Sequence, residues 1–145
     1  MGSEFREYVT GGDGVITIEL SWPDKRLSPN SRCHWREKAK AATEARSYAY
    51  TEGVLIDKRL SILSGDYQAN YIFHPPDRRR RDIDNCLSMM KAAQDGVCQA
   101  YNMDDICIKR TVLEWGEVVK GGKVVLRLSE IGEIRELEEM TEWLG

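Results

Sequence analysis

The chain lacks the long apolar run that a membrane-spanning helix requires. Hydrophobic residues make up 41% of its 145 residues, but no stretch approaches the roughly 20 consecutive apolar residues that cross a bilayer. No charged segment followed by an apolar one opens the chain, so no secretory signal is expected. We therefore expect a protein that stays in the cytoplasm and does not associate with membranes.

Cysteine and histidine are also scarce. The chain has four cysteines and two histidines. The cysteines form neither a Cys-x-x-Cys pair nor zinc-ligand spacing with the histidines, and they are Cys33, Cys86, Cys98 and Cys107. In the cytoplasm such thiols stay reduced and mostly buried. The sequence therefore predicts neither a disulfide nor a structural metal site.

An excess of positive charge is missing too, because the formal net charge is −3. The acidic residues are unevenly distributed: residues 129–145 hold six of them and one arginine, and removing this local −5 leaves +2 for the remainder. Residues 25–46 hold seven Lys or Arg against two Glu. This stretch is a candidate phosphate-binding surface, and the alternative is an ordinary solvated helix surface.

The length predicts a single domain with one core. Residues 1–14 look like a cloning remnant followed by a flexible, glycine-rich N-terminus. Residues 15–128 are expected to form the folded domain. Residues 129–145 carry apolar residues at helical spacing among glutamates, so we expect an appended acidic helix that packs on its own domain or on a partner subunit.

Residues 15–20 and 67–74 alternate apolar and polar residues with the period of two that is typical of half-buried strands. Residues 106–115 also suit a strand, and residues 123–128 are its expected partner. Gly121 and Gly122 predict a turn that would make the last two strands a hairpin.

Two segments favour helices. Residues 34–51 are rich in Ala, Lys, Glu and Arg, with Gly53 as the expected stop and a narrow apolar stripe at Trp35, Ala39, Ala42, Ala45 and Ala49. Residues 84–100 combine a core stripe with a polar stripe made of Asp84, Ser88, Lys91 and Asp95. Together with the strands, these helices predict an α+β domain with a mixed sheet and two main helices.

The most informative stretch lies where the second strand gives way to the second helix. It holds Arg78, Arg79, Arg80 and Arg81, followed by Asp82, Ile83, Asp84 and Asn85. The guanidinium group suits phosphate oxygens, and the carboxylate is the hard oxygen ligand that Mg²⁺ prefers. Asp104 and Asp105 add a second acidic pair. Carboxylates from two such loci are what a metal-dependent phosphodiesterase needs, although a charge run of this kind is usually a solvated loop.

This stretch, together with residues 91–95 (Lys-Ala-Ala-Gln-Asp) and the pair Asp104-Asp105, resembles the RusA family of Holliday junction resolvases of bacteria, phages and prophages. The resemblance covers residues 16–128, and the Arg-Asp-x-Asp-Asn block is its most specific part. It implies that Asp82, Asp84 and Asp105 bind the catalytic metal and that a helical lysine assists.

The lysine departs from the family pattern. The resemblance places it four residues after the second aspartate of the block, where this chain has Ser88, whereas Lys91 follows seven residues after Asp84. Three residues shift a side chain by about 4.5 Å along a helix. Lys91 would still reach the phosphate if the helix is set back or if residues 85–88 form extra loop, and its Lys-Ala-Ala-x-Asp context favours Lys91 over Ser88.

The resemblance implies a Mg²⁺-dependent endonuclease, with Mn²⁺ as a substitute ion, that acts on four-way DNA junctions as a homodimer. Asp104 is a further candidate metal ligand. The candidate DNA-binding residues are Arg78, Arg79, Arg80, Arg81, Asn30, Arg32 and Arg36. Two alternatives remain open: a junction-binding protein without cleavage, and a less specific nuclease for flaps or other branched DNA.

Overall fold

The computed structural model describes residues 15–56, 65–131 and 141. The predicted N-terminal extension and most of the predicted C-terminal helix lie outside the described residues. Within the described part of the chain, no helix is long and apolar enough to cross a membrane.

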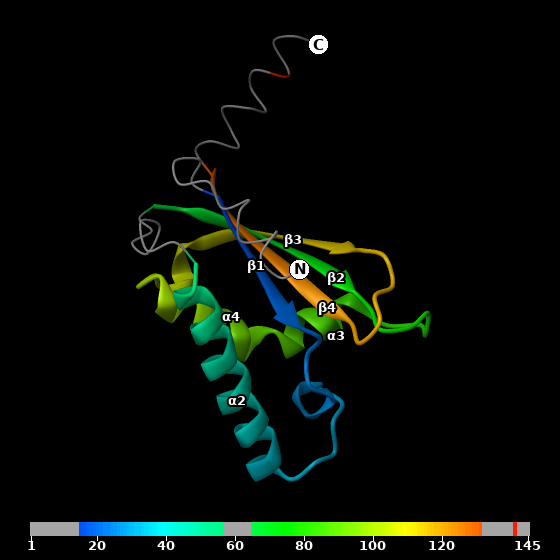
Figure 1. The fold of residues 1–145 in the computed structure, drawn as a ribbon. Helices are drawn as coiled ribbons and strands as arrows, with labels where there is room; N and C mark the ends of the chain where they lie inside the picture. The colour runs from blue at the N-terminus through cyan, green and yellow to red at the C-terminus, as the bar shows by residue number, and fades with distance from the viewer. Residues whose placement is uncertain (1–14, 57–64, 132–140, 142–145) are drawn as a thin grey trace.

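A four-stranded sheet forms the centre of the fold (Figure 1). Its strands run in the order β1-β4-β2-β3, with bounds β1 Val15–Ser21, β2 Tyr67–His74, β3 Ile108–Trp115 and β4 Lys123–Glu130. β4 is antiparallel to both β1 and β2, whereas β3 is parallel to β2. The predicted α+β class and mixed sheet are therefore confirmed, and β4 extends to Glu130, beyond the predicted domain limit.

The predicted hairpin between the last two strands is wrong, because β2 lies between them. β4 has three consecutive buried residues, Val124, Val125 and Leu126, as expected of a central strand covered by neighbours. The connection from β3 instead crosses the end of β2, where the Gly116 amide donates to the Phe73 carbonyl. Gly121 and Gly122 do form a turn, both at positive φ.

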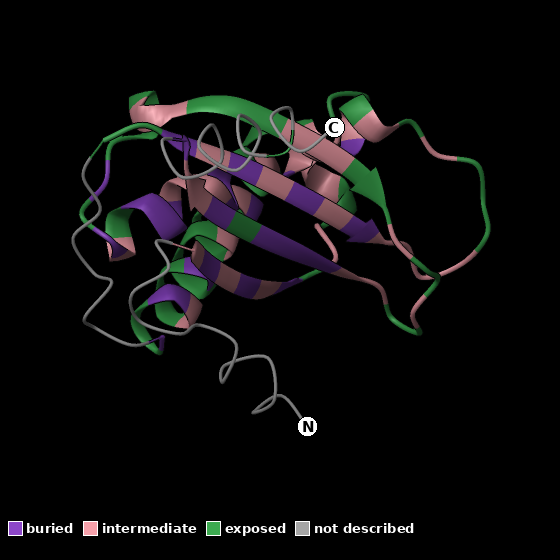
Figure 2. Cartoon of the chain, turned by 90° about the horizontal axis from the view of Figure 1, so that it is seen from above, coloured by how far each residue is buried: buried purple, intermediate pink, exposed green. Residues whose placement is uncertain are grey.

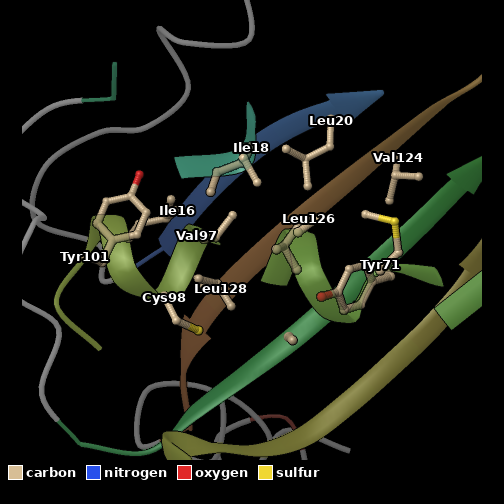
Figure 3. Packing of buried hydrophobic residues seen from close by; sticks show 14 of the residues in the cluster. Ile16, Ile18, Leu20, Tyr71, Val97, Cys98, Tyr101, Val124, Leu126 and Leu128 are labelled. Atoms are coloured by element: carbon tan, nitrogen blue, oxygen red, sulfur yellow. The ribbon is translucent and has the colours of Figure 1, made fainter. Parts of the chain in front are cut away.

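One face of the sheet holds the core. Buried and partly exposed residues alternate along β1 and β2 (Figure 2), as the period of two predicts. Helix α3 (Ile83–Met89) contributes Cys86 to the same cluster, and helix α4 (Lys91–Ala100) contributes Val97 and Cys98 (Figure 3). Met90, between the two helices, is also part of it. All four cysteines are free thiols, of which Cys86 and Cys98 are buried. The core thus fixes how α3 and α4 pack on the sheet.

Helix α2 (Trp35–Val54) packs chiefly on α4 rather than on the sheet. The approach is close, because a Cβ at Gly96 would collide with the Arg46 carbonyl, and one at Gly53 would lie 2.7 Å from the Ala100 Cβ. Gly53 is therefore a buried packing residue inside the helix rather than its stop.

The predicted apolar stripe of α2 is confirmed in part: Ala49 is buried and Ala42 and Ala45 are half-buried, but the stripe does not include the first turn of the helix. The buried residues are Ala41, Ala49 and Gly53, whereas Trp35 is 68% exposed and Ala39 is also exposed. The stripe that faces α4 follows four-residue steps ending at Gly53, and the first turn of α2 lies beyond it.

The second predicted helix is two helices. Met90 breaks it, since its amide donates to Leu87 rather than to the residue four positions back, and the next helix starts when Gln94 donates to Met90. The Met90 side chain is 2% exposed, so burial of this residue in the core accompanies the change of direction. The polar stripe predicted on one helical face is therefore divided between α3 and α4.

Candidate functional site

The arginine run is anchored at one end by Asp77. The Asp77 carboxylate accepts from the Arg79 amide at 2.9 Å and pairs with Arg81 at 2.8 Å. The Arg79 amide, followed by Arg81, lowers the pKa of Asp77 below its ordinary value. Arg81 also donates to the carbonyls of Asp77 and Arg79, both at 3.1 Å. Arg81 is therefore partly a structural residue of the loop, whereas Arg78, Arg79 and Arg80 are exposed.

Asp82 and Asp84 lie together at the start of α3. The Asp82 side chain is the N-cap and accepts from the Asp84 amide at 3.0 Å, and Asp84 stands in the first turn. Both residues are exposed. A helix N-terminus is a favourable position for negatively charged groups. Their oxygen donors therefore suit a hard divalent cation.

The second acidic pair belongs to a separate ion-pair cluster. Asp104 caps the short helix η3 (Asp105–Cys107) by accepting from the Ile106 amide. The Lys91 ammonium lies 2.8 Å from Asp105 and 3.3 Å from Asp95. The hydrogen bond between Lys91 and Asp105 lowers the pKa of Asp105 and raises the pKa of Lys91. The structure thus brings together two predicted site residues that are 14 positions apart.

The break between α3 and α4 determines the position of Lys91. Lys91 is the first residue of α4, and residues 85–88 are helical, so the extra loop considered for these residues is not formed. Ser88 is exposed, and its hydroxyl donates to the Asp84 carbonyl at 3.1 Å. Ser88, which occupies the position of the family lysine, therefore turns its side chain back along α3. Lys91 instead starts a new helix beside Asp105.

Three site carboxylates do not gather in the described residues. Across residues 15–56, 65–131 and 141, no group of three or more His, Cys, Asp or Glu side chains could hold a metal ion. The chemistry of Asp82 and Asp84 fits Mg²⁺, but binding by Asp105 competes with its ion pair to Lys91. Convergence of Asp82, Asp84 and Asp105 on one ion stays a prediction.

A cavity of about 420 Å³ opens beside Asp82. This volume falls within the range of about 300–1,000 Å³ that is common for ligand sites. Its wall combines the loop after β1, the arginine run and α3, with the lining residues Trp22, Pro23, Lys25, Ser28, Arg80, Arg81, Asp82, Asn85, Cys86 and Met89. The Arg81 guanidinium lies 5.5 Å from the centre of the Trp22 ring. One acidic and three basic side chains thus share a wall with apolar groups.

The loop after β1 and the start of α2 form a basic surface next to this cavity. Arg26 is tied to Asp24, Glu37 and Glu44 at 2.8 to 3.2 Å, so both glutamates of residues 25–46 gather around this one arginine. The predicted DNA-binding residues Asn30, Arg32 and Arg36 are all exposed. The other six Lys and Arg residues of this stretch lie outside the Arg26 cluster, so the positive charge is separated from the glutamates.

The chain is similar to proteins of known family. A protein of unassigned function from Xylella fastidiosa is 35% identical over 125 residues, which are 85% of this chain and 82% of that protein. Crossover junction endodeoxyribonuclease RusA of Escherichia coli K12 is 31% identical over 123 residues, 81% of this chain and 97% of that protein. The protein of the same name from Shigella sonnei has the same identity and coverage. The chain belongs to the RusA family.

Membership in the RusA family confirms the resemblance that the Arg-Asp-x-Asp-Asn block carried. The match spans nearly the full length of the relatives named RusA, so it covers a whole domain and not a short motif. No family model matches the chain. The catalytic roles of Asp82, Asp84, Asp105 and Lys91 stay predictions.

Sequence reasoning missed several residues of the RusA-family chain that line the cavity beside Asp82. Trp22 and Met89 come from segments that held no motif, whereas Lys25 belongs to the basic stretch of residues 25–46. The available signal was the position of Trp22, directly after a strand and before Pro23, where a side chain is held at the edge of a sheet.

Proposed function

We propose that this protein is a metal-dependent endonuclease that resolves four-way DNA junctions by hydrolysing phosphodiesters. The observation that carries the proposal is the 31% identity over 97% of the length of a protein named crossover junction endodeoxyribonuclease. The exposed aspartates at the start of α3, beside a cavity with arginine in its wall, are consistent with that activity.

Asp82 and Asp84 would hold the metal, with Asp105 completing the site and Asp104 assisting. Mg²⁺ is the expected ion and Mn²⁺ its substitute. When bound, such an ion polarises the phosphate and activates a water molecule. The Asp82 carboxylate accepts from the Asp84 amide, and this hydrogen bond orients the Asp82 side chain at the start of α3.

The cations act on the DNA. Arg78, Arg79 and Arg80 are exposed on the loop that leads to Asp82, and they would bind phosphates beside the scissile one. Lys91 keeps its proton, since its pKa is raised by Asp105. It therefore acts as a fixed positive charge that stabilises charge developing on the phosphate oxygens, and not as a general base.

Resolution requires paired cuts in two opposed strands. One site per subunit in a homodimer provides two cuts, and this assembly is part of the proposal. The protein would act on branched DNA rather than on continuous duplex.

Cleavage of matched substrates tests the proposal. A synthetic four-way junction, a flap, a duplex and a single strand are incubated with the protein in Mg²⁺ or in EDTA. We expect paired cuts in the junction only, and only with Mg²⁺. Equal cutting of flap and junction would indicate a less specific branched-DNA nuclease. Junction binding without cutting in either Mg²⁺ or Mn²⁺ would indicate a binding protein.

A further inference from the structure

Trp35 is the most exposed large apolar side chain in the described part of the chain, at 68%. It is the first residue of α2, and the helix turns its buried stripe of Ala41, Ala49 and Gly53 elsewhere. Tryptophan gains more than most residues from being covered, because its ring presents a large apolar area with a single N–H donor. An open ring at this position is therefore available for a contact with a partner.

The surroundings of the ring are cationic. The Arg36 guanidinium lies 5.3 Å from the centre of the Trp35 ring, and the His34 ring centre lies 5.6 Å away at a tilt of 31°. Arg32 is exposed nearby in sequence. The acidic residue of this turn, Glu37, is paired with Arg26 at 3.1 Å. The expected partner of the ring is therefore anionic and aromatic at once, and nucleic acid has both properties.

The helix turn that begins with Trp35 is connected to the cavity beside Asp82 through Lys38. The Lys38 ammonium donates to the Ser28 carbonyl at 3.2 Å, and Ser28 lines that cavity together with Arg80 and Asp82. Trp35 and Lys38 are three residues apart and share a helical face. In Figure 1 the N-terminal end of α2 projects away from the sheet, past the loop that follows β1. Trp35 thus lies one helical turn beyond the rim of the cavity.

We propose that Trp35 stacks on a base exposed at the branch point of a DNA junction and that this contact selects branched over continuous DNA. The inference rests on the proposed function, whose substrate it concerns. A continuous duplex hides the faces of its bases inside the stack, whereas an opened branch point exposes them. Arg36 and Arg32 bind the adjoining phosphates, which both kinds of DNA possess. The Trp35 ring therefore distinguishes branched from continuous DNA, whereas Arg32 and Arg36 do not.

The effect on affinity is measurable. Stacking of a base on an aromatic side chain changes affinity by about 5- to 150-fold per base, and it tolerates any base sequence. We expect Trp35→Ala to weaken binding of a four-way junction by about tenfold and to leave binding of a duplex of equal length within about twofold. Trp35→Phe keeps a ring and should retain most of the preference.

Fluorescence anisotropy with the full chain, without divalent metal, compares junction and duplex binding for each variant. Tyr50→Ala is the matched control, because Tyr50 is an exposed aromatic residue of the same helix; it should change neither affinity. A second readout places 2-aminopurine at the branch point, where stacking quenches its fluorescence. The wild type should quench this signal on binding and Trp35→Ala should not.

Three results would overturn the inference. Equal weakening of junction and duplex binding by Trp35→Ala would make the ring a general DNA contact. Unchanged junction affinity with unchanged quenching would remove it from the interface. A change of molar mass in light scattering, with the junction preference intact, would assign the ring to a contact between copies of the chain. If the wild-type protein itself showed no preference for the junction over the duplex, that result would contradict the proposed function. The wild-type measurement shows this before any variant is compared.

Discussion

The two acidic pairs of this protein differ in how their charge is balanced. Asp82 and Asp84 lie at the N-terminus of α3, where backbone amides and the helix dipole stabilise them. Asp105 is instead paired directly with the Lys91 ammonium at 2.8 Å. As a proposed metal ligand, Asp105 would have to share or give up its contact with Lys91. Identical residue types thus need different rearrangements before they can hold the same ion.

The largest effect is expected at the first pair. Asp82→Asn and Asp84→Asn should each abolish cleavage, because each removes a charged metal ligand. Junction binding should stay the same or increase, because repulsion of phosphate falls. Asparagine is as good an N-cap as aspartate, so Asp82→Asn should keep the start of α3 and the melting temperature. Single-turnover cleavage at saturating junction measures the loss, and full activity in either variant would remove that residue from the site.

The second pair should separate into one essential and one auxiliary residue. Asp105→Asn should also abolish cleavage, and it frees Lys91 from its strongest partner. Asp104→Asn should reduce the rate less, because Asp104 caps η3 and asparagine can still cap it. Metal titrations of the cleavage rate would compare the two variants. Equal damage from both would mean that both carboxylates bind the ion.

Lys91 comes next in expected effect. Lys91→Ala should lower the single-turnover rate by about 10², the cost of losing one positioned charge at the transition state, with junction binding little changed. Lys91→Arg keeps the charge and is the matched control. Ser88→Ala should be nearly silent, because the Ser88 hydroxyl is engaged by the Asp84 carbonyl. Slowing by Ser88→Ala with a silent Lys91→Ala would return the assisting role to the family position.

The arginines should fall into two classes. Replacement of Arg79 and Arg80 together by Ala should reduce the salt dependence of junction binding by about two counterions, since each lost phosphate contact lowers the slope by about 0.9. Arg81→Ala should instead lower the melting temperature, because Arg81 bonds two carbonyls of its own loop and Asp77. Anisotropy titrations across salt concentrations and thermal melts distinguish the classes. An unchanged slope would leave Arg79 and Arg80 as solvated residues.

The smallest effect concerns Asp77 and pH. Its pKa in the folded protein lies below the ordinary 3.8, first because of the Arg79 amide and then because of Arg81. A lowered carboxyl pKa stabilises the fold above the ordinary value, and this contribution is lost as pH falls through the folded-state pKa. Asp77→Asn should therefore melt slightly below the wild type at pH 6, and the difference should shrink in acid. A pH-independent difference would assign the effect to lost geometry alone.

The local elements of this fold could be read from sequence, and their pairing could not. The alternation in residues 67–74 predicted β2 because one face of that strand is buried residue by residue. The place of β4 between β1 and β2 depends on contacts far apart in the chain, and the turn at Gly121 and Gly122 favoured a hairpin that those contacts override.

In the candidate site, too, the contiguous residues could be predicted from the sequence and the long-range contacts could not. The block at Asp82 and Asp84 is contiguous, so its residues, and the family, could be named from the sequence. The contact between Lys91 and Asp105 follows from a break at Met90 that is linked to core packing. The exposure of Trp35 follows from which stripe of α2 faces α4. Both depend on tertiary packing that periodicity along one helix does not contain.

The glycine contacts between α2 and α4 have a mechanical consequence. With no side chain separating Gly96 from the Arg46 carbonyl, the two helices have little clearance to shift independently. α2 begins at Trp35 and α4 begins at Lys91. We therefore expect the two helices to move as one rigid unit. DNA bound at the start of α2, as proposed, would then also change the position of Lys91 beside Asp105.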